Sequence, residues 1–436
     1  NYLSFELTKP QKKVLKEIRN DFASNQQMIR LLQGDVGSGK TVVALLSILI
    51  SIDNNYQSCL VAPTEILAFQ HFKNFKDKLE NLGLVVKVLT GSTKSSDRKI
   101  LLNDLKNGSI NLLIGTHAIF EQNVIFNNLG YAVIDEQHRF GVKQRSKIWE
   151  KNNPPPHVLI MTATPIPRTL TMSLYGDLDL SIIDELPPGR KDVITVHRKD
   201  KNRLKVFGFI RDQIKQGRQI YIVYPLIEES KKMDLKYLED GLESITREFD
   251  KENYSIGVMH GRMRSSNKDI EMNNFLNGKI DILISTTVIE VGVNVPNASV
   301  MIIENAERFG LSQLHQLRGR VGRGKYDSYC VLMTNDKISE DAKIRIDAMV
   351  NSNDGFKISE VDLRLRGPGD VLGTKQSGVL DFKIADIIED ESILFSVSNE
   401  ADLLIKKDPK LNLNENYNIR SFILNNPINK SWNEIG

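Results

Sequence analysis

The segment GDVGSGKT, residues 34–41, combines the residue types that bind phosphate. Its glycines let the backbone bend, so that several N–H groups can point inward toward one anion. The lysine of such a segment reaches the β- and γ-phosphates of a nucleotide, and its threonine hydroxyl ligates Mg²⁺. The segment therefore predicts a site for ATP with Mg²⁺, built from Gly34, Asp35, Val36, Gly37, Ser38, Gly39, Lys40 and Thr41.

The segment DEQH, which begins at Asp135, supplies carboxylates for the same chemistry. The apolar run YAVI, residues 131–134, comes directly before it. We predict that Asp135 holds Mg²⁺, directly or through water, and that Glu136 orients and deprotonates the attacking water. On its own the segment could be a solvated acidic turn, but the upstream phosphate-binding segment favours the metal site. His138 is a lone histidine, which is more often structural.

The segment QLRGRVGRG, residues 316–324, places three arginines between glycines. One interpretation is a solvated basic turn. The other depends on SQLHQLRG, from Ser312, which predicts a helix that breaks at glycine just before Arg320 and Arg323. An arginine that meets the transferring phosphoryl group accelerates nucleotide hydrolysis by about 10³–10⁵-fold. We predict that Arg320 and Arg323 face the γ-phosphate from the opposite half of the chain.

The elements that must position these residues are strands and helices in alternation. Helices are predicted at residues 65–79 and 96–108. Such alternation indicates βαβ units in parallel sheets, whose ligands bind beyond the carboxyl ends of the strands. Strands are predicted at residues 28–33, 59–63, 85–89, 111–115, 131–135, 157–163, 219–227, 255–260, 281–287, 299–306 and 328–333.

The segment ELPPGRKD, residues 185–192, interrupts this alternation. Paired prolines and a glycine between polar residues are typical of an interdomain linker. Beyond about Asp336 the pattern turns helical and then polar. We therefore predict a first α/β lobe at residues 1–188, a second at 189–336 and a C-terminal appendage at 337–436.

The totals limit the classes of protein that the chain can represent. Its 436 residues suffice for two or three domains. Lys plus Arg total 58 and Asp plus Glu 55, so binding to a polyanion must depend on local clusters of charge. Cys59 and Cys330 lie in apolar runs, which predicts buried thiols in a reducing compartment rather than a disulfide framework.

No apolar run is long enough to cross a bilayer, which takes about 20 residues. No signal peptide precedes the first predicted strand. We therefore expect a cytoplasmic protein with no membrane partner. The chain begins at Asn1 rather than Met, and we expect it to be a fragment or a processed product.

Several long motifs resemble, in order, those of second-superfamily helicases of the DExH type. They are GDVGSGKT, APTEILAFQH, GTHAIF, DEQH, TATPIPRTL, STTVIEVGVNVP and QLHQLRGRVGRG. Within this superfamily the chain is most similar to the RecG family of bacterial DNA translocases. The segments that carry this closer resemblance are HRFGVKQR, DELPPGR, YPLIEES and DLRLRGPGDVLGTKQSG.

The resemblance covers essentially the whole chain and implies two RecA-like P-loop lobes with a C-terminal helical hairpin and loop. It corresponds to the family's motor and C-terminal region, without the N-terminal wedge domain that engages branched DNA. Without the wedge, we expect the chain to hydrolyse ATP but to unwind DNA poorly.

The resemblance also implies roles for residues in the nucleotide site. Gln11 reads adenine, and Gln316 joins Arg320 and Arg323 at the γ-phosphate. Gly292 and Asn294 contact the nucleotide; relatives usually carry Asp at the latter position, and an amide keeps the acceptor but loses the charge.

The resemblance implies that further residues contact the nucleic-acid backbone or couple the nucleotide site to the nucleic-acid site. Contacts to phosphate from backbone N–H groups and hydroxyls suit a motor that ignores base sequence. Each residue could also be an ordinary cap or turn. Nine of them are Thr64, Gly91, Thr116, His117, Thr162, Thr164, His260, Thr286 and Thr287. Three more, Arg364, Arg366 and Gln376, lie in a translocation motif that the family shares with the transcription-repair coupling factor.

The expected function is an ATP-dependent double-stranded DNA translocase or helicase that remodels branched DNA, such as stalled forks and Holliday junctions, in replication-fork rescue, DNA repair and recombination. The alternatives are a transcription-repair coupling motor, an RNA helicase and a non-enzymatic, nucleotide-gated DNA-binding scaffold. The intact Glu136, Arg320 and Arg323 argue against the scaffold. The expected partners are branched or duplex DNA, with a single-stranded-DNA-binding protein as a further candidate. We expect a monomer.

Overall fold

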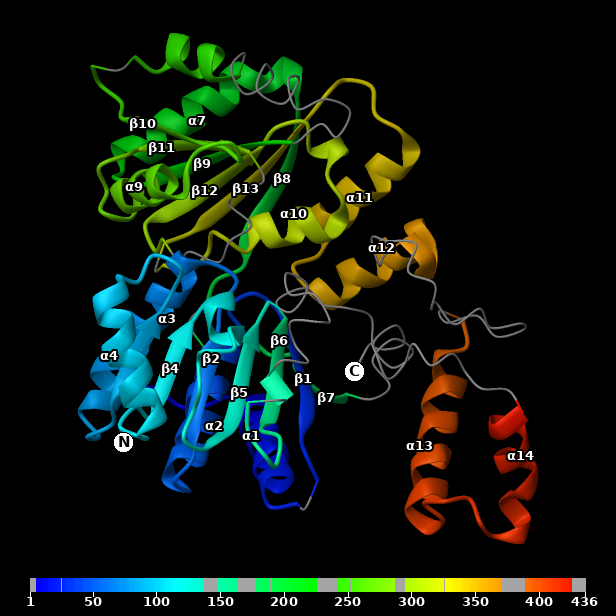
Figure 1. Ribbon diagram of the computed structural model, residues 1–436. Coiled ribbons are helices and arrows are strands. Elements are labelled where there is room, and N and C mark those ends of the chain that lie inside the picture. The colour runs from blue at the N-terminus through cyan, green and yellow to red at the C-terminus, as the bar shows by residue number, and fades with distance from the viewer. Residues whose placement is uncertain are drawn as a thin grey trace.

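The structure, a computed structural model, describes residues 5–24, 26–136, 148–149, 151–162, 178–188, 190–225, 241–250, 252–286, 295–324, 326–370 and 389–425. These residues form two parallel β-sheets, one above the other in Figure 1, followed by a helical C-terminal region. The prediction of two α/β lobes with parallel sheets is therefore confirmed. Within the described ranges, none of the helices could cross a membrane.

The first sheet has the strand order β3-β4-β2-β5-β6-β1-β7, and all of its pairs are parallel. Its strands are β1 (Ile29–Gly34), β2 (Gln57–Val61), β3 (Val86–Leu89), β4 (Leu112–Gly115), β5 (Leu129–Asp135), β6 (His157–Thr162) and β7 (Asp179–Ile183). The helical elements of this lobe are α1 (Lys9–Phe22), α2 (Lys40–Asp53), α3 (Glu65–Glu80), α4 (Ser95–Lys106) and the short η1 (His117–Phe120).

The second sheet has the order β10-β11-β9-β12-β13-β8 and is also parallel. Its strands are β8 (Val193–Lys199), β9 (Gln219–Tyr224), β10 (Ile256–Met259), β11 (Ile282–Thr286), β12 (Ala298–Ile303) and β13 (Ser328–Thr334). The helical elements of this lobe are η3 (Asp200–Asn202), α7 (Arg203–Lys215), α9 (Ser265–Leu276), η5 (Ala306–Arg308) and α10 (Leu311–Arg318).

Strands β7 and β8 were not among the predicted strands. Each lies at one edge of its sheet, where only one neighbour hydrogen-bonds to it. In both strands, buried residues are interrupted by partly or fully exposed ones, so neither forms the continuous apolar run of a central strand. The predicted linker, residues 185–192, lies between them and therefore joins the two sheets at matching edges.

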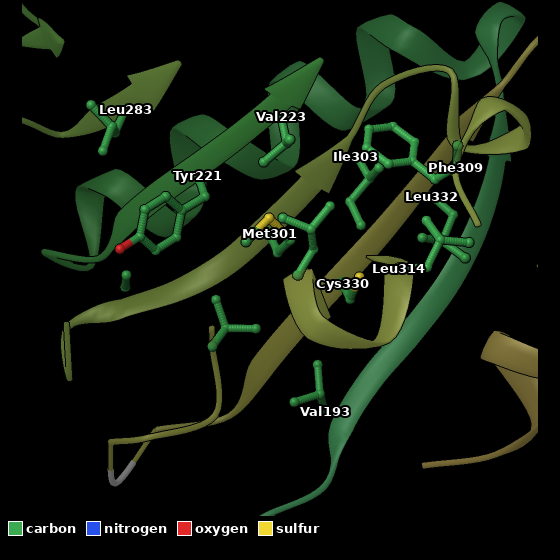
Figure 2. Packing of buried hydrophobic residues seen from close by; sticks show 14 of the residues in the cluster. Val193, Tyr221, Val223, Leu283, Met301, Ile303, Phe309, Leu314, Cys330 and Leu332 are labelled. Carbon is green, nitrogen blue, oxygen red and sulfur yellow. The ribbon is translucent and has the colours of Figure 1, made fainter. Parts of the chain in front are cut away.

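Helix α10 is fixed to the second sheet by its apolar face. Leu311, Leu314 and Leu317 are fully buried in the core of this lobe. Figure 2 shows Leu314 near Met301 and Cys330, over the strands that carry them. Because the helix is held in this way, the residues that follow it have a defined direction.

The C-terminal region begins with a helical hairpin beside α10. Helices α11 (Glu340–Asn351) and α12 (Gly355–Asp370) pack on each other and on α10. Gly367 has a φ of 73°, so the helical geometry of α12 is broken there. Helices α13 (Glu391–Lys407) and α14 (Tyr417–Asn425), connected through η6 (Asn414–Asn416), lie beside each other and apart from both sheets in Figure 1.

Candidate active site

The segment at residues 34–41, predicted to bind phosphate, forms the turn between β1 and α2, the strand–turn–helix context that was expected. Gly37 and Gly39 have φ values of 81° and 90°, a region that residues with a Cβ rarely adopt. Helix α2 begins at Lys40, so its free N–H groups point toward the turn and favour an anion. Thr41 is the second residue of this helix.

Lys40 is buried, and its Nζ donates to the carbonyls of Gly34 at 2.6 Å and Asp35 at 3.0 Å. Burial lowers the pKa of Lys40, and the charge of Glu136 is the strongest effect that opposes it. The other charges that act on this pKa belong to Asp35, Asp135 and Arg323. A buried cation held by neutral carbonyls, with carboxylates close by, fits both a nucleotide phosphate and its metal ion.

Gln11 lies against the turn. Its Nε2 donates to the carbonyl of Ser38 at 2.8 Å, and its Oε1 accepts from the N–H of Thr8 at 3.0 Å. The latter bond belongs to the capping box that starts α1. The helix cap therefore sets the position of the glutamine that was predicted to read adenine.

Asp135 ends β5 and meets a residue from α3. The Nε2 of His71 lies 3.0 Å from Oδ2 of Asp135, and His71 is only 6% exposed. Glu136 follows with a φ of 55°, a strained conformation for a residue with a side chain. Sequence analysis missed His71, although it closes the quoted motif APTEILAFQH.

Arg323 of the second lobe lies near the turn, since its charge lowers the pKa of Lys40, and Arg320 is buried beside Arg323. Arg323 donates from Nε to the carbonyl of Gly319 at 3.1 Å. Burial and the guanidinium groups of Arg320 and Arg190 lower the pKa of Arg323 to about 9, and the charge of Glu136 opposes this shift. Cations from one lobe and a carboxylate from the other therefore share one site.

The tip of the turn holds the lobes together through residues that sequence analysis did not pair. His315 Nε2 lies 2.7 Å from Oδ1 of Asp35. Burial alone would raise the pKa of Asp35, but the hydrogen bond and charge of His315 shift it below its usual value. A Cβ at Gly319 would lie 2.8 Å from Cβ of Val36, so Val36 fills the space beside this glycine.

Arg318, the first arginine of QLRGRVGRG, has a different environment. It is 3% exposed and donates to the carbonyls of Met349 at 3.0 Å, Ser352 at 2.7 Å and Asn353 at 3.3 Å. Its Nη2 also lies 3.1 Å from Nδ1 of His315. Hydrogen bonds thus run from Asp35 in the first lobe to the turn between α11 and α12.

The described residues predicted to track nucleic acid follow or end strands. Because the strands of each sheet are parallel, their carboxyl ends share one edge of that sheet. In the first lobe these residues are Thr64, after β2; Gly91, after β3; Thr116 and His117, after β4; and Thr162, at the end of β6. In the second lobe they are His260, after β10, and Thr286, at the end of β11.

Some of these side chains have local partners. Thr64 caps α3 by accepting from the N–H of Leu67 at 3.4 Å. The carboxylate of Glu65 accepts from the N–H and hydroxyl of Ser92, at 3.0 and 2.6 Å, and so holds the turn that contains Gly91. The hydroxyls of Thr116 and Thr286 are buried without a hydrogen-bond partner among the described residues.

Gln316 lies on α10, and Arg364 is exposed on α12. The other predicted site residues lie outside the described part of the chain. They are Thr164, Thr287, Gly292, Asn294, Gln376 and the side chain of Arg366.

Three known families match the chain in order. The DEAD/DEAH box helicase family matches residues 8–173, the helicase conserved C-terminal domain residues 202–325, and the C-terminal part of domain 3 of ATP-dependent DNA helicase RecG residues 352–426. The ATP-dependent DNA helicase RecG of Synechocystis sp. is 50% identical over 96% of this chain and 50% of that protein. The RecG of Bacillus subtilis is 48% identical over 93% of this chain and 59% of that protein. The chain thus spans between about half and three fifths of the length of these relatives.

Solved structures agree with these matches. A structure of RecG bound to a three-way DNA junction has a TM-score of 0.75 and 44% identity, over 90% of this chain and 51% of that chain. Mycobacterium smegmatis helicase Lhr bound to ssDNA and AMP-PNP, at 18% identity and a TM-score of 0.56, shares the fold alone, over 79% of this chain and 47% of that chain. The fold is that of two RecA-like lobes with a C-terminal helical region. The chain therefore belongs to the RecG family of ATP-dependent DNA helicases.

Proposed function

We propose that this chain hydrolyses ATP and uses the reaction to move along duplex DNA, so that branched DNA is remodelled during fork rescue, repair and recombination. One observation carries the proposal: Arg323 from the second lobe lies close enough to Lys40 of the first to lower its pKa, and close enough to Glu136 for that carboxylate to act on the pKa of Arg323. A site shared by two lobes makes hydrolysis depend on how the lobes are arranged, which is how a chemical step becomes motion.

Each predicted residue has a proposed role in this chemistry. Lys40 binds the β- and γ-phosphates, and Gln11 contacts adenine. Glu136 accepts the proton of the attacking water, while Arg320 and Arg323, with Gln316, stabilise negative charge on the transferred group. Thr41 and Asp135 would hold Mg²⁺, which when bound neutralises charge on the phosphates.

The proposed nucleic-acid surface consists of the strand-end residues of both lobes. Two observations support it. In each lobe these residues lie at the carboxyl ends of the parallel strands, and a similar chain, RecG, was solved bound to a three-way DNA junction. We further propose a cytoplasmic monomer, with a single-stranded-DNA-binding protein as a candidate partner. The proposed lobe boundaries, at residues 188 and 336, fall between β7 and β8 and between β13 and α11.

The test is the ATPase rate of the chain with single-stranded, duplex, forked and three-way-junction DNA and with duplex RNA, at one stated salt concentration. We expect branched DNA to stimulate hydrolysis at least tenfold more than RNA. Equal stimulation by DNA and RNA would instead favour an RNA helicase. ATP binding without turnover on any of these ligands would favour the nucleotide-gated scaffold.

Arg323→Ala serves as the internal control for this experiment. It should bind ATP nearly as well as the parent chain but hydrolyse it about 10³-fold more slowly, because the group it contacts gains charge only during transfer. Normal hydrolysis by this variant would show that stimulation does not depend on the second lobe.

A further inference from the structure

Arg190 lies in the segment that joins the two sheets, yet its guanidinium group sits on the phosphate-binding turn. Nη1 donates to the carbonyl of Val36. A Cβ at Gly37 would collide with the same Nη1 and with Cζ, so only glycine leaves room for the guanidinium there. Sequence analysis treated this arginine only as part of a linker motif.

The contact with Val36 uses only some of the hydrogen-bond donors of the Arg190 guanidinium. Arginine has five N–H donors. Within the part of the chain that the structure describes, the Arg190 guanidinium donates only to this one carbonyl. Asp35 and Asp192 lie near enough to raise the pKa of Arg190 against the larger opposing effect of burial. Donors therefore remain for a further acceptor at the turn.

The charges around Arg190 indicate what that acceptor is. Arg190 and Arg320 both lower the pKa of Arg323, and Arg323 in turn lowers the pKa of Lys40, so positive charge accumulates on this side of the turn. Like charges held together away from water are stable only when an anion joins them. The side of the site that faces Arg320 and Arg323 is the side proposed for the γ-phosphate.

We propose that Arg190 is a third arginine that binds the γ-phosphate of ATP, supplied by the segment that joins the two sheets. In the structure its Nη1 donates to the carbonyl of Val36, within the turn proposed to bind the β- and γ-phosphates. The segment between β7 and β8 must change conformation when the lobes move. A contact from Arg190 would therefore couple the presence of the γ-phosphate to the conformation of this segment. The assignment deepens the proposed function and rests on its nucleotide site.

The test compares nucleotide affinities of the whole chain without DNA, by competition of ATPγS and of ADP against a fluorescent ADP analogue. Arg190→Ala should weaken ATPγS about 10–100-fold, the loss expected for a charge-assisted hydrogen bond, and change ADP less than about threefold. Arg190→Lys should recover part of the affinity for ATPγS. The matched control is Lys191→Ala, because Lys191 is exposed and pairs with Asp327 on the surface.

The comparison of two nucleotides separates a phosphate contact from support of the turn. If Arg190 only braced the turn, ADP and ATPγS would weaken together and the melting temperature would fall, and the proposal would be overturned. Unchanged affinity for both would overturn it as well. The readout is binding, so a chain that binds ATPγS but never hydrolyses ATP would refute the proposed function and leave this assignment standing.

Discussion

The carboxylate of Asp135 is fixed by a hydrogen bond to His71, a residue of a different element. Asp135 stands at the end of a strand, where its side chain could adopt more than one rotamer. The imidazole of His71, buried on α3, restricts that choice at a distance of 3.0 Å. Partners that orient a ligating carboxylate are as important to metal binding as the ligand itself.

We predict that His71→Ala raises the Mg²⁺ concentration needed for half-maximal ATP hydrolysis by about 10–100-fold, because Asp135 loses its orienting partner. A titration of activity with Mg²⁺ measures this effect. His71→Gln, which keeps a donor at a similar reach, should recover much of it, whereas nucleotide affinity measured in EDTA should not change. An unaltered Mg²⁺ requirement in His71→Ala would show that the histidine serves packing alone.

The local motifs predicted where residues lie within their own segment. Gly34–Thr41 forms the turn as expected, and Arg320 and Arg323 follow the end of α10. The residues that were missed contact partners far away in the sequence. His71 lies 64 positions from Asp135, and His315 lies 280 positions from Asp35. Nothing in the spacing of a single sequence links residues so far apart, because only the packed lobes bring them together.

At the level of elements, Arg318 joins α10 to the hairpin of α11 and α12. The backbone carbonyls at the end of α11 have no partner within the helix, so a buried guanidinium is a suitable donor for them. The same side chain contacts His315, which in turn contacts Asp35 in the turn between β1 and α2. The hairpin is therefore tied to this turn by hydrogen bonds as well as by apolar packing.

We expect Arg318→Met to lower the free energy of unfolding by about 2–4 kcal/mol, because buried carbonyls would lose a charged donor. Chemical denaturation measures the change, and hydrogen exchange should show faster opening at the end of α11. Lys343→Ala, on helix α11, is the control. The ion pair of Lys343 with Glu340, 3.9 Å away, is exposed, so its loss should change the free energy of unfolding little. Equal stability of the two variants would mean that the hairpin is held by apolar contacts alone.

The prediction of elements succeeded where burial produces a strong pattern. Central strands such as β2 and β9 are buried along their whole length, and each contains an apolar run after a polar start. Helix α4 ends near Gly108, whose φ of 82° suits the predicted stop. Edge strands β7 and β8 carry exposed and polar side chains, and single-sequence patterns do not distinguish such strands from loops.

For the whole molecule, the critical contact is the one between the tip of the turn and the second lobe. Gly319 has an ordinary helical conformation, so alanine brings no backbone strain there. Its Cβ would nevertheless lie 2.8 Å from Val36, closer than real Cβ contacts allow. The lobes would have to separate slightly, and Arg320 and Arg323 would move with them.

We predict that Gly319→Ala lowers the maximal rate of ATP hydrolysis by about tenfold or more, since displacements near 1 Å have effects of this size on catalysis. Affinity for ADP should stay within a few-fold, because the turn itself is intact. Steady-state kinetics and nucleotide titration measure the two quantities. Gly208→Ala, at a helical position with open space around it, is the matched control. If Gly319→Ala hydrolysed ATP at the wild-type rate, the positions of Arg320 and Arg323 would not affect the rate-limiting step.

The two sheets are joined through their edge strands β7 and β8, so a rotation of one sheet at this joint would displace the far edge of that sheet most. The opposite edges are β3 and β10, which precede Gly91 and His260. Strands stand about 4.8 Å apart, so five intervals put β10 about 24 Å from the pivot, and a rotation of about 10° would carry it about 4 Å. One base step of B-form DNA is about 3.4 Å. A small rotation at the joint between β7 and β8 would thus suffice to move the far edge of the second sheet by the length of one base step.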